Sequence, residues 1–439
     1  MAHITPYIII HVHLESEHDI YSRVKEDGRY YLLFWWEQIP LGQLTIEEGE
    51  TMDANSLQLK IIRAIQPCIE FYKSKSGLIM NSYISAFLKN DYGQFLTVMD
   101  KIFSDQQVNS LPKILNVSVV ICTCNRPKEL NRFMNSLVNQ VFPVTEIIVV
   151  DNAPSDDTTR QVIEKFEQAI YYREEKKGLS MARNAGLRLA TAQIIAFSDD
   201  DVVLHPLWSY RVWETFLSPE VKAMTGLTIA LNLETESQQI FEKYWSFNRG
   251  YEEKEFNYDF IEDNLKAGPP VWMIGAGANM AFRKSIFDAI GCFDERLGAG
   301  SSGCSEDSEI WYRILLRGFC ISYNPRAVAY HEHRKEIRAL KKQMYSYARG
   351  HVVAALIQQN LNKNAGYKKR VFVEYPVFYL RRLIKGFPKY QHKNRTLFSE
   401  ILGWRSGIVF FKRKCKTLPK AMGPGRLIIT DVAQKPQAI

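Results

Sequence analysis

The chain has 439 residues and a formal net charge of +8, with 46% hydrophobic and 24% charged residues. This length exceeds the roughly 250 to 300 residues at which a single core stops growing, so two or three folded domains are expected. No apolar run reaches the roughly 18 to 20 residues that span a bilayer, and no basic segment leads into an apolar one at the start of the sequence. A cytoplasmic protein is therefore expected.

Residues 1–110 are expected to form a small α+β accessory module. The composition predicts strands at 7–12 and 30–36, with residues 39–44 supplying a turn before a further short strand. Helical periodicity covers residues 56–72. No motif with recognisable chemistry accompanies these elements, so the sequence assigns the module no role.

Between residues 115 and 335, predicted strands alternate with predicted helices. The strands fall at 117–121, 146–150, 170–173 and 193–197, and the helices at 128–139, 157–168 and 180–190. Strands that alternate with helices of this length imply βαβ units and a mostly parallel sheet flanked by helices. This region is therefore predicted to be an α/β, Rossmann-like domain.

Three consecutive carboxylates, Asp199, Asp200 and Asp201, follow the last of these strands. Open α/β sheets build ligand sites at the carboxyl ends of their strands. Mg²⁺ is usually held by one or two carboxylates together with substrate phosphates. The alternative is a solvated turn, because Asp is common in turns. The position after a parallel strand favours a metal-bridged phosphate ligand.

Three other segments are expected at the same edge of the sheet. Thr123, Asn125 and Arg126 lie in a loop that leads into a helix, whose free N–H groups favour anions. Asp151 ends the second strand and can accept a hydrogen bond from a base or a ribose, although a cap or an Asx-turn is the alternative. Arg183 lies near the start of the third helix, where a surface ion pair is the alternative.

Together these segments resemble the family 2 glycosyltransferases of the GT-A fold. The resemblance covers about half of the chain, from roughly 117 to 335. It implies an inverting transfer of a sugar from a nucleotide-diphosphate sugar to a hydroxyl of a glycan or lipid-linked saccharide. The matching segments are 119–126, 148–152, 178–186, 199–201, 275–283, 291–294 and 305–309.

The resemblance also implies how the donor is bound. The nucleotide side would be held by Thr123, Asn125, Arg126, Asp151, Arg183, Asp199 and Asp200. Asp201, together with Asp199, would bind Mn²⁺ or Mg²⁺. His331 is the candidate third ligand and His333 the second choice, with a structural histidine as the alternative. A UDP-sugar is favoured as donor, with dTDP- and GDP-sugars as alternatives.

The catalytic base implied by the resemblance is Asp307, at the start of a predicted helix. A base needs hydrogen-bond reach and a suitable pKa, whereas helix capping is the alternative, since acids are favoured at helix N-termini. The sugar or acceptor pocket would be lined by Trp272, Gly277, Asn279 and Glu306. For Trp272, core packing is the alternative.

Residues 336–439 are predicted to form a basic, mainly helical extension. Residues 338–359 have helical periodicity, and 375–387 mix aromatic residues with Arg381, Arg382 and Lys385. Such a stretch can lie peripherally at the inner face of the membrane or pack on the catalytic domain.

Two readings compete with an active glycosyltransferase. One is a catalytically silent scaffold that binds a nucleotide-sugar, and the other is a nucleic-acid-binding protein that uses the basic extension. No recognised RNA or DNA motif accompanies that charge, so nucleic acid is not an expected partner. Neither the sugar, the acceptor, the linkage nor the oligomeric state is indicated by the sequence, because a few pocket contacts decide specificity and the fold does not.

Overall fold

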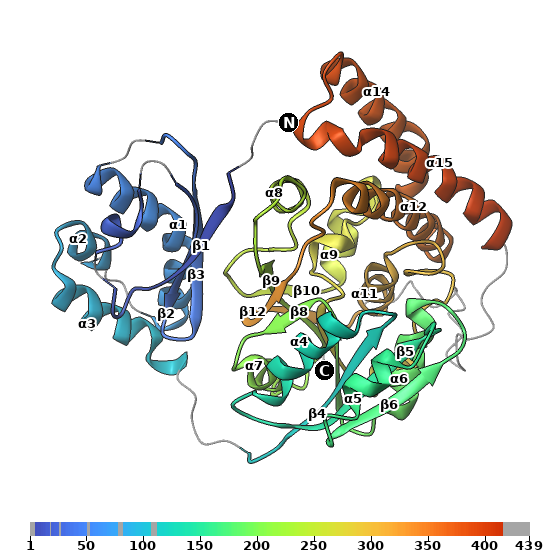
Figure 1. Cartoon of the computed structure of the whole chain (residues 1–439), viewed down its shortest axis with the longest axis horizontal. Helices are drawn as coiled ribbons and strands as arrows, with labels where there is room; N and C mark the ends of the chain where they lie inside the picture. The colour runs from blue at the N-terminus through green and yellow to red at the C-terminus, as the bar shows by residue number, and fades with distance from the viewer. Residues whose placement is uncertain are drawn as a thin grey trace. The chain divides into compact units, whose positions relative to one another are not determined.

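The computed structural model describes residues 5–17, 19–25, 28–50, 53–77, 82–106 and 112–415. The chain divides into two compact units (Figure 1). The first unit comprises residues up to 113 together with 232–239 and 250–253, and the second comprises 114–231, 240–249 and 254 onward. The last part of the predicted C-terminal extension, 416–439, lies outside the described residues.

The first unit contains a three-stranded sheet covered by helices. Strand β2 (Arg29–Trp36) pairs in parallel with β1 (Tyr7–His13) and antiparallel with β3 (Ile39–Ile46). The predicted turn at 39–44 is wrong. The turn is formed by residues 37 and 38, where Glu37 has a positive φ of 49°, and the residues after it continue directly into β3.

Helix α1 (Ala54–Lys75) contributes one apolar stripe to the core of this unit. Its N-terminus is capped by Asp53, whose side chain accepts from the N–H of Ser56 at 2.7 Å. Buried Leu57, Ile61, Ile65 and Ile69 recur at the spacing of one helical face. The other helices here are α2 (Ser82–Leu88) and α3 (Tyr92–Phe103), with short 3₁₀ turns at Tyr21–Arg23 and Ser104–Gln106.

The second unit is built on a mixed sheet, so the predicted α/β class is confirmed. The strand order is β10-β12-β9-β11-β7-β4-β5-β6, with β8 paired to β12. Neighbours from β7 to β6 are parallel, as the βαβ pattern predicts, whereas β11 is antiparallel to both β7 and β9. The strands are β4 (Leu115–Thr123), β5 (Val144–Asn152), β6 (Ala169–Glu174), β7 (Ile194–Asp199), β8 (Val202–Leu204), β9 (Val221–Ala230), β10 (Lys254–Phe256), β11 (Asn279–Arg283) and β12 (Cys320–His331).

The helices of this unit follow the predicted pattern, with one difference in length. The helix predicted over 157–168 ends at Ile163, because the chain turns back there: the N–H of Phe166 donates to the carbonyl of Ile163 at 2.8 Å, and β6 begins three residues later. The helices are α4 (Pro127–Val138), α5 (Thr158–Ile163), α6 (Leu179–Leu189), α7 (Trp208–Thr215), α8 (Glu236–Trp245), α9 (Tyr258–Asp263), α10 (Ile286–Ile290) and α11 (Glu306–Leu316), with 3₁₀ turns at Leu265–Ala267 and Val271–Met273. The part of α8 before residue 240 belongs to the first unit.

Strand β7 delivers the three aspartates to the edge of the sheet. It is hydrogen-bonded on one side to β4 and on the other to β11, and its residues from Ile194 to Ser198 are buried. A strand held on both sides cannot shift its register without exposing its apolar face. Asp199 pairs in register with Cys122 at the end of β4, which brings the loop at 123–126 beside the acids.

The C-terminal extension is helical, as predicted. It consists of α12 (Ile337–Leu361), α13 (Tyr367–Lys369), a π-helical turn (Arg370–Glu374), α14 (Tyr375–Gly386), a 3₁₀ turn (His392–Thr396) and α15 (Leu397–Lys414). Helices α12 and α15 pack closely through glycines of α15. A Cβ at Gly403 would lie only 2.3 Å from the carbonyl oxygen of Tyr345. Among the described residues, no helix combines the length and apolarity needed to span a bilayer.

Candidate active site

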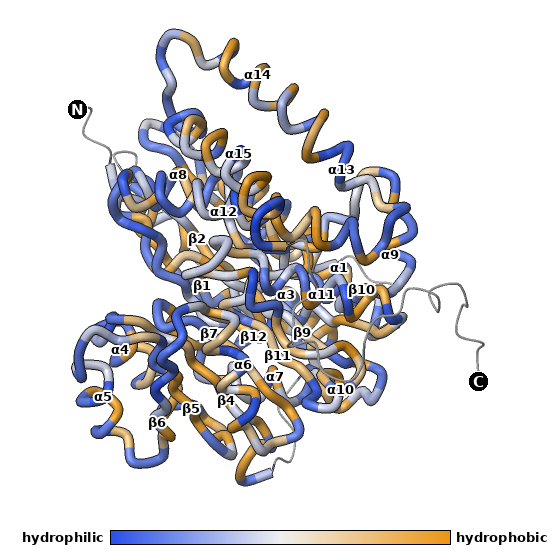
Figure 2. The backbone as a smooth tube through the Cα atoms, turned by 90° about the vertical axis from the view of Figure 1, so that its right-hand side faces the viewer, coloured by the Kyte–Doolittle hydropathy of each residue, from blue (hydrophilic) through white to orange (hydrophobic). Residues whose placement is uncertain are grey.

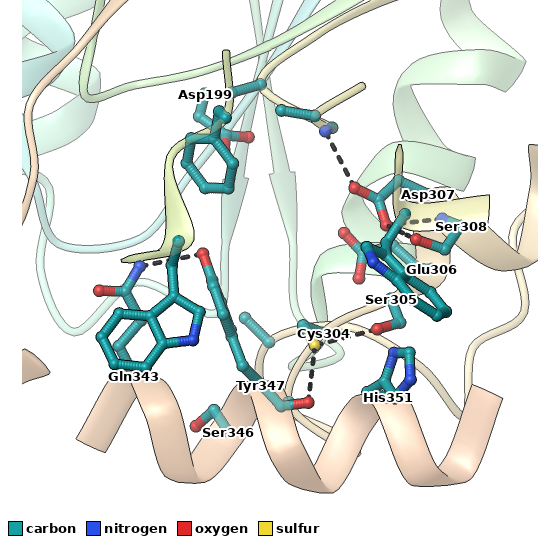
Figure 3. Close-up of a pocket in the computed structure, with 18 of the residues that line it drawn as sticks. Asp199, Cys304, Ser305, Glu306, Asp307, Ser308, Gln343, Ser346, Tyr347 and His351 are labelled. Carbon is teal, nitrogen blue, oxygen red and sulfur yellow. Dashed lines mark hydrogen bonds between the residues drawn. The ribbon is translucent and has the colours of Figure 1, made fainter. Parts of the chain in front are cut away.

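A cleft of about 1490 Å³ lies in the second unit, at the carboxyl ends of β4 and β7. Figure 3 shows part of it, with Asp199, Glu306 and Asp307 facing the side chains of α12 across the cavity. The cleft brings together most of the residues that the sequence singles out. Its lining includes Thr123, Arg126, Arg183, Asp199, Asp200, Asp201, Trp272, Gly277, Glu306, Asp307 and His331.

The middle aspartate, Asp200, is held by the loop after β4. Its Oδ2 accepts from the hydroxyl of Thr123 at 2.7 Å, and its Oδ1 pairs with the guanidinium of Arg126. Burial raises the pKa of Asp200 to about 7, with the neighbouring Asp201 carboxylate adding to the effect and Arg126 opposing it. Thr123, Arg126 and Asp200 therefore form a buried support beneath the outer acids.

Asp201 is buried among cationic and imidazole groups. Its Oδ2 lies 2.9 Å from Arg126 and 3.3 Å from Arg334, and its Oδ1 lies 3.4 Å from Nε2 of His331. Burial alone would raise the pKa of Asp201, but His331, Arg126 and Arg334 together hold it below its usual range. The carboxylate is therefore ionised at neutral pH. Its Oδ1 is buried and, apart from this contact with His331, accepts no hydrogen bond from any of the described residues.

A relay of side chains orients His331. Its Nδ1 lies 3.0 Å from Nδ1 of His333, whose Nε2 lies 2.9 Å from a carboxylate oxygen of Glu242. Burial lowers the pKa of His331 to about 4 against the opposing effect of Asp201, so the ring is neutral at pH 7. A neutral imidazole positioned through its other nitrogen is the arrangement found in metal-ligating histidines.

The Asp201 and His331 pair fits a divalent cation. The partnerless Oδ1 of Asp201 faces a neutral ring nitrogen, and both groups are buried. Within the described residues, no group of three or more His, Cys, Asp or Glu side chains could hold a metal ion. The protein side of such a site would thus be small, as is usual where substrate phosphates supply further oxygens.

Arg183 links the acids of β7 to the start of α11. It lies on α6, its side chain is 2% exposed, and its Nη1 lies 2.5 Å from Oε1 of Glu306. Its Nη2 lies 3.4 Å from Asp199 and 3.3 Å from the carbonyl oxygen of Gly277. Arg183 is therefore buried and connects Glu306 with Asp199. The predicted alternative of a surface ion pair is wrong for this residue.

Asp307 is oriented by the backbone of the small-residue segment opposite. Its Oδ2 accepts from the N–H of Gly277 at 2.9 Å, and its Oδ1 accepts from the N–H of Ser308 at 2.6 Å (Figure 3). The second contact also satisfies a free N–H donor at the N-terminus of α11, so the side chain of Asp307 also caps the start of this helix. Backbone N–H groups thus hold both carboxylate oxygens of Asp307, which lines the cleft.

Glu306 stands beside Asp307 in a different environment. It is 5% exposed, and burial raises its pKa to about 7, with Asp307 adding to the effect and Arg183 opposing it. The loop before α11 reaches this point through left-handed backbone at Gly300, Gly303 and Ser305, whose φ angles are 85°, 125° and 72°. Two adjacent acids are therefore held by different partners.

Three of the predicted residues do not line the cleft. Asn125 accepts from the N–H of Ser155 at 2.9 Å, and Asp151 is fully buried and accepts from the hydroxyl of Tyr171 at 3.0 Å. Asn279 is also fully buried. It joins three elements of the core, donating to the carbonyls of Leu227 and Ala327 and accepting from the indole N–H of Trp208. In the structure the hydrogen bonds of these three side chains therefore go to residues that do not line the cleft.

Trp272 lines the outer part of the cleft and is half-buried. Its ring centroid lies 4.6 Å from that of His351, in an edge-to-face arrangement, and the guanidinium carbon of Arg370 lies 5.0 Å from the indole. Trp272 therefore packs against neighbouring side chains and also lines the cleft, so core packing alone does not describe it.

The sequence analysis missed the contribution of α12. Gln343, Tyr347 and His351 line the cleft from this helix, and the amide of Gln343 donates to the hydroxyl of Tyr347 at 2.9 Å (Figure 3). Their spacing of four residues places them on one helical face, and this spacing could have indicated from the sequence that they act together. Arg334 was missed too, because its pairing with Asp201 depends on how the chain turns after β12.

Comparisons with known proteins agree on the nature of this region. The family model for glycosyl transferase family 2 matches residues 118–291. A hyaluronan synthase of Pasteurella multocida is 26% identical over 243 residues, which are 50% of this chain and 24% of that protein. A glucosyl-dolichyl phosphate glucuronosyltransferase of Haloferax volcanii is 23% identical over 285 residues, 62% of this chain and 88% of that protein.

A solved mannosyltransferase from Pyrobaculum calidifontis, in complex with GDP-Man and Mn²⁺, covers 77% of this chain and 99% of its own, with 16% identity and a TM-score of 0.46. The chain spans only about a quarter of the length of the hyaluronan synthase that it matches. The family resemblance is nevertheless confirmed by the family model and by several curated relatives that are glycosyltransferases. Residues 118–291 are therefore similar to the glycosyltransferases of family 2.

Proposed function

We propose that this protein is an inverting glycosyltransferase that moves a sugar from a nucleotide-diphosphate sugar to a hydroxyl of a glycan or lipid-linked saccharide. The observation that carries the proposal is the position of Asp307. Its carboxylate is oriented by Gly277 and Ser308 and opens into the same cleft that contains the three aspartates after β7. Base and donor-binding acids thus line one cavity from opposite elements.

In the proposed reaction, Asp307 accepts the proton of the acceptor hydroxyl as its oxygen attacks the anomeric carbon. The new glycosidic bond forms on the face opposite the donor phosphate. The bond from the anomeric carbon to the phosphate oxygen breaks, and the nucleoside diphosphate leaves with the electron pair. Positioned general bases contribute about 10² to 10⁴ in rate. Attack from the opposite face inverts the configuration of the sugar.

The donor is proposed to lie along the acids after β7. Arg126 supplies positive charge beside Asp200 and Asp201, and Arg183 supplies it beside Asp199 and Glu306. Asp199, whose side chain is 35% exposed, is placed to accept from the ribose hydroxyls. UDP-sugars remain the favoured donors, as the resemblance implies.

Mn²⁺ or Mg²⁺ is proposed to be held by Asp201, with His331 as the imidazole ligand and donor phosphates supplying further oxygens. Asp199, the further carboxylate expected from the sequence, is assigned to the ribose alone, since no group of three His, Cys, Asp or Glu side chains among the described residues could hold a metal ion. When bound, such an ion neutralises charge on the diphosphate leaving group. The relay through His333 and Glu242 keeps the ring of His331 in place. The partnerless Oδ1 of Asp201 supports this assignment.

The acceptor is proposed to enter past Trp272 and the polar face of α12. The Haloferax relative is named for a dolichyl phosphate-linked glucose, and relatives in Pasteurella and Escherichia coli are named as hyaluronan and chondroitin synthases. Both groups of names support a saccharide acceptor. A cytoplasmic location stays a prediction from the sequence.

The test is the substitution Asp307→Asn, assayed by nucleotide release from a panel of UDP-, GDP- and dTDP-sugars with Mn²⁺ present. We expect turnover to fall by about 10² to 10⁴ while donor affinity, measured by calorimetry, stays close to that of the wild type. Asp156→Asn changes an exposed acid that accepts hydrogen bonds from Thr158 in its own turn; it is the matched control and should leave turnover intact. Full turnover in Asp307→Asn would contradict the assignment, and donor binding without turnover in the wild type would favour the silent scaffold.

A further inference from the structure

One face of the helical segment 370–387 is apolar and open to solvent. Figure 2 shows hydrophobic and hydrophilic residues alternating along α14. The exposed apolar residues are spaced by four, three, four and three positions, which places them on a single stripe. This α14 stripe consists of Val373, Val377, Leu380, Ile384 and Phe387, which are 54%, 43%, 57%, 68% and 75% exposed.

An apolar stripe of this kind is uncommon on the solvent-exposed surface of a soluble protein. Singly exposed apolar residues are normal, but contiguous apolar patches on the surface mark interaction sites. Burying these side chains against the rest of the fold would have been favourable, yet α14 buries Tyr379 and Arg382 instead. The other side of the helix is thus the one used for internal packing.

The opposite face of α14 lines the catalytic cleft. Tyr375, Tyr379 and Arg382 lie about half a turn away from the stripe, and all three border the cleft, together with Phe378 at the side of the helix. Arg382 is fixed by ion pairing with Glu400 of α15 at 2.6 Å. One helix therefore separates the cleft from the surface that carries the stripe.

The surroundings of the stripe are strongly basic. Arg381 and Lys385 lie along one flank of it, and Lys368 and Lys369 precede it, all four exposed to solvent. Between residues 366 and 415 the sequence contains only two acidic residues. These are Glu374, half-buried beside Lys369, and Glu400, buried against Arg382. The exposed charge next to the stripe is thus positive.

We propose that the α14 stripe docks on an anionic lipid bilayer, and that the acceptor is a lipid-linked saccharide that reaches the cleft from that surface. An apolar helix face flanked by Lys and Arg binds in the interfacial plane of a membrane, through apolar burial and attraction to anionic head groups. The position of the cleft behind the same helix places the reacting groups close to the bilayer. The identity of the acceptor in this inference rests on the proposed glycosyl transfer, whereas bilayer docking does not.

The experiment is vesicle co-sedimentation of the full-length protein. Vesicles contain either phosphatidylcholine alone or a mixture with phosphatidylglycerol. We expect binding to the anionic vesicles and little to the neutral ones. The variant Leu380→Ser/Ile384→Ser/Phe387→Ser should lower the apparent binding constant at least about tenfold, since each buried apolar side chain contributes. Arg381→Gln/Lys385→Gln should lower it about fivefold for each charge removed.

The matched control removes three exposed apolar side chains elsewhere in the second unit. Val141→Ser/Ile170→Ser/Leu217→Ser changes residues that are 56%, 47% and 64% exposed and should bind vesicles like the wild type. Melting temperatures of all variants show whether each is folded. Donor hydrolysis without vesicles should be unchanged in the stripe variant, whose three residues do not line the cleft.

Two results would overturn the inference. One is equal vesicle binding by the wild type and the stripe variant. The other is a dimer in light scattering that the stripe variant dissociates, without vesicle binding by the wild type, because the stripe would then cover a second copy of the chain. Either result with normal donor hydrolysis leaves the proposed transfer standing. Loss of hydrolysis in Asp307→Asn with intact vesicle binding leaves the docking standing.

Discussion

The position of the proposed base can be tested without changing the base itself, by the substitution Gly277→Ala. A Cβ at this position would lie 3.0 Å from Oδ2 of Asp307 and 3.1 Å from Nη2 of Arg183. Both distances are shorter than ordinary van der Waals contacts, so each of the two side chains must move by a few tenths of an ångström. Gly277 has no positive φ, so alanine adds no backbone strain and the effect comes from the Cβ alone.

The expected consequence is a misplaced carboxylate. Asp307 can yield only by weakening the hydrogen bond from the N–H of Gly277, because its other oxygen is held by Ser308. Misplacement of a catalytic group by 1 Å costs about 10² in rate, so a smaller shift should lower kcat about tenfold. The affinity for the nucleotide-sugar donor, measured without an acceptor, should change little.

The assay is nucleotide release under saturating donor, with the melting temperature measured in parallel. Gly93→Ala is the matched control, because the nearest atom to its added Cβ is 3.8 Å away, and the substitution should leave kcat unchanged. Wild-type kcat in Gly277→Ala, combined with inactivity of Asp307→Asn, would refute the reasoning that the backbone of this segment positions the base.

Two further predictions concern the buried charges. Arg183→Met should lower the free energy of unfolding by about 3 kcal/mol in urea titrations, the low end for a broken buried pair, since Glu306 can take up a proton. Arg160→Met, in an exposed pair with Glu164, should change it by less than about 0.5 kcal/mol, and equal losses would contradict the bridging role. Asp201→Ala should weaken donor binding in the presence of Mn²⁺ at least about tenfold, as measured by calorimetry. Adding EDTA to the wild type should weaken donor binding in the same way, whereas the control variant Asp263→Ala should bind the donor like the wild type. Unchanged donor affinity in saturating Mn²⁺ would count against the metal site.

Local patterns predicted the parallel half of the sheet well. Strands β4, β5, β6 and β7 each contain an apolar run bounded by polar residues, and the helices between them carry one apolar face. The turn near 39–44 was misplaced because Ile39–Ile46 is itself a buried strand. Pro40 and Gly42 suggested a turn, but tertiary pairing with β2 overrode that signal.

The candidate site was predictable where its residues follow strand ends. Asp199, Asp200, Asp201 and the loop with Thr123 and Arg126 meet because parallel strands end at one edge. Asn279 was assigned to the pocket by the family resemblance alone, whereas Asn125 and Asp151 were also placed at this edge by their positions after predicted strands. In the structure all three side chains form hydrogen bonds with residues that do not line the cleft. Whether a polar side chain turns inward or outward at a strand end depends on its neighbours in space.

The sequence by itself determined the α/β class, the family and the order of the acidic motifs, because these follow from local periodicity and short-range spacing. Only the tertiary structure decided which charges meet: Arg183 with Glu306, and Arg334 with Asp201. The tertiary structure likewise decided that one face of α12 lines the cleft. It also decided that α14 presents one face to the cleft and leaves the other exposed. Periodicity shows that a helix has two faces, but which face is buried depends on what packs against it.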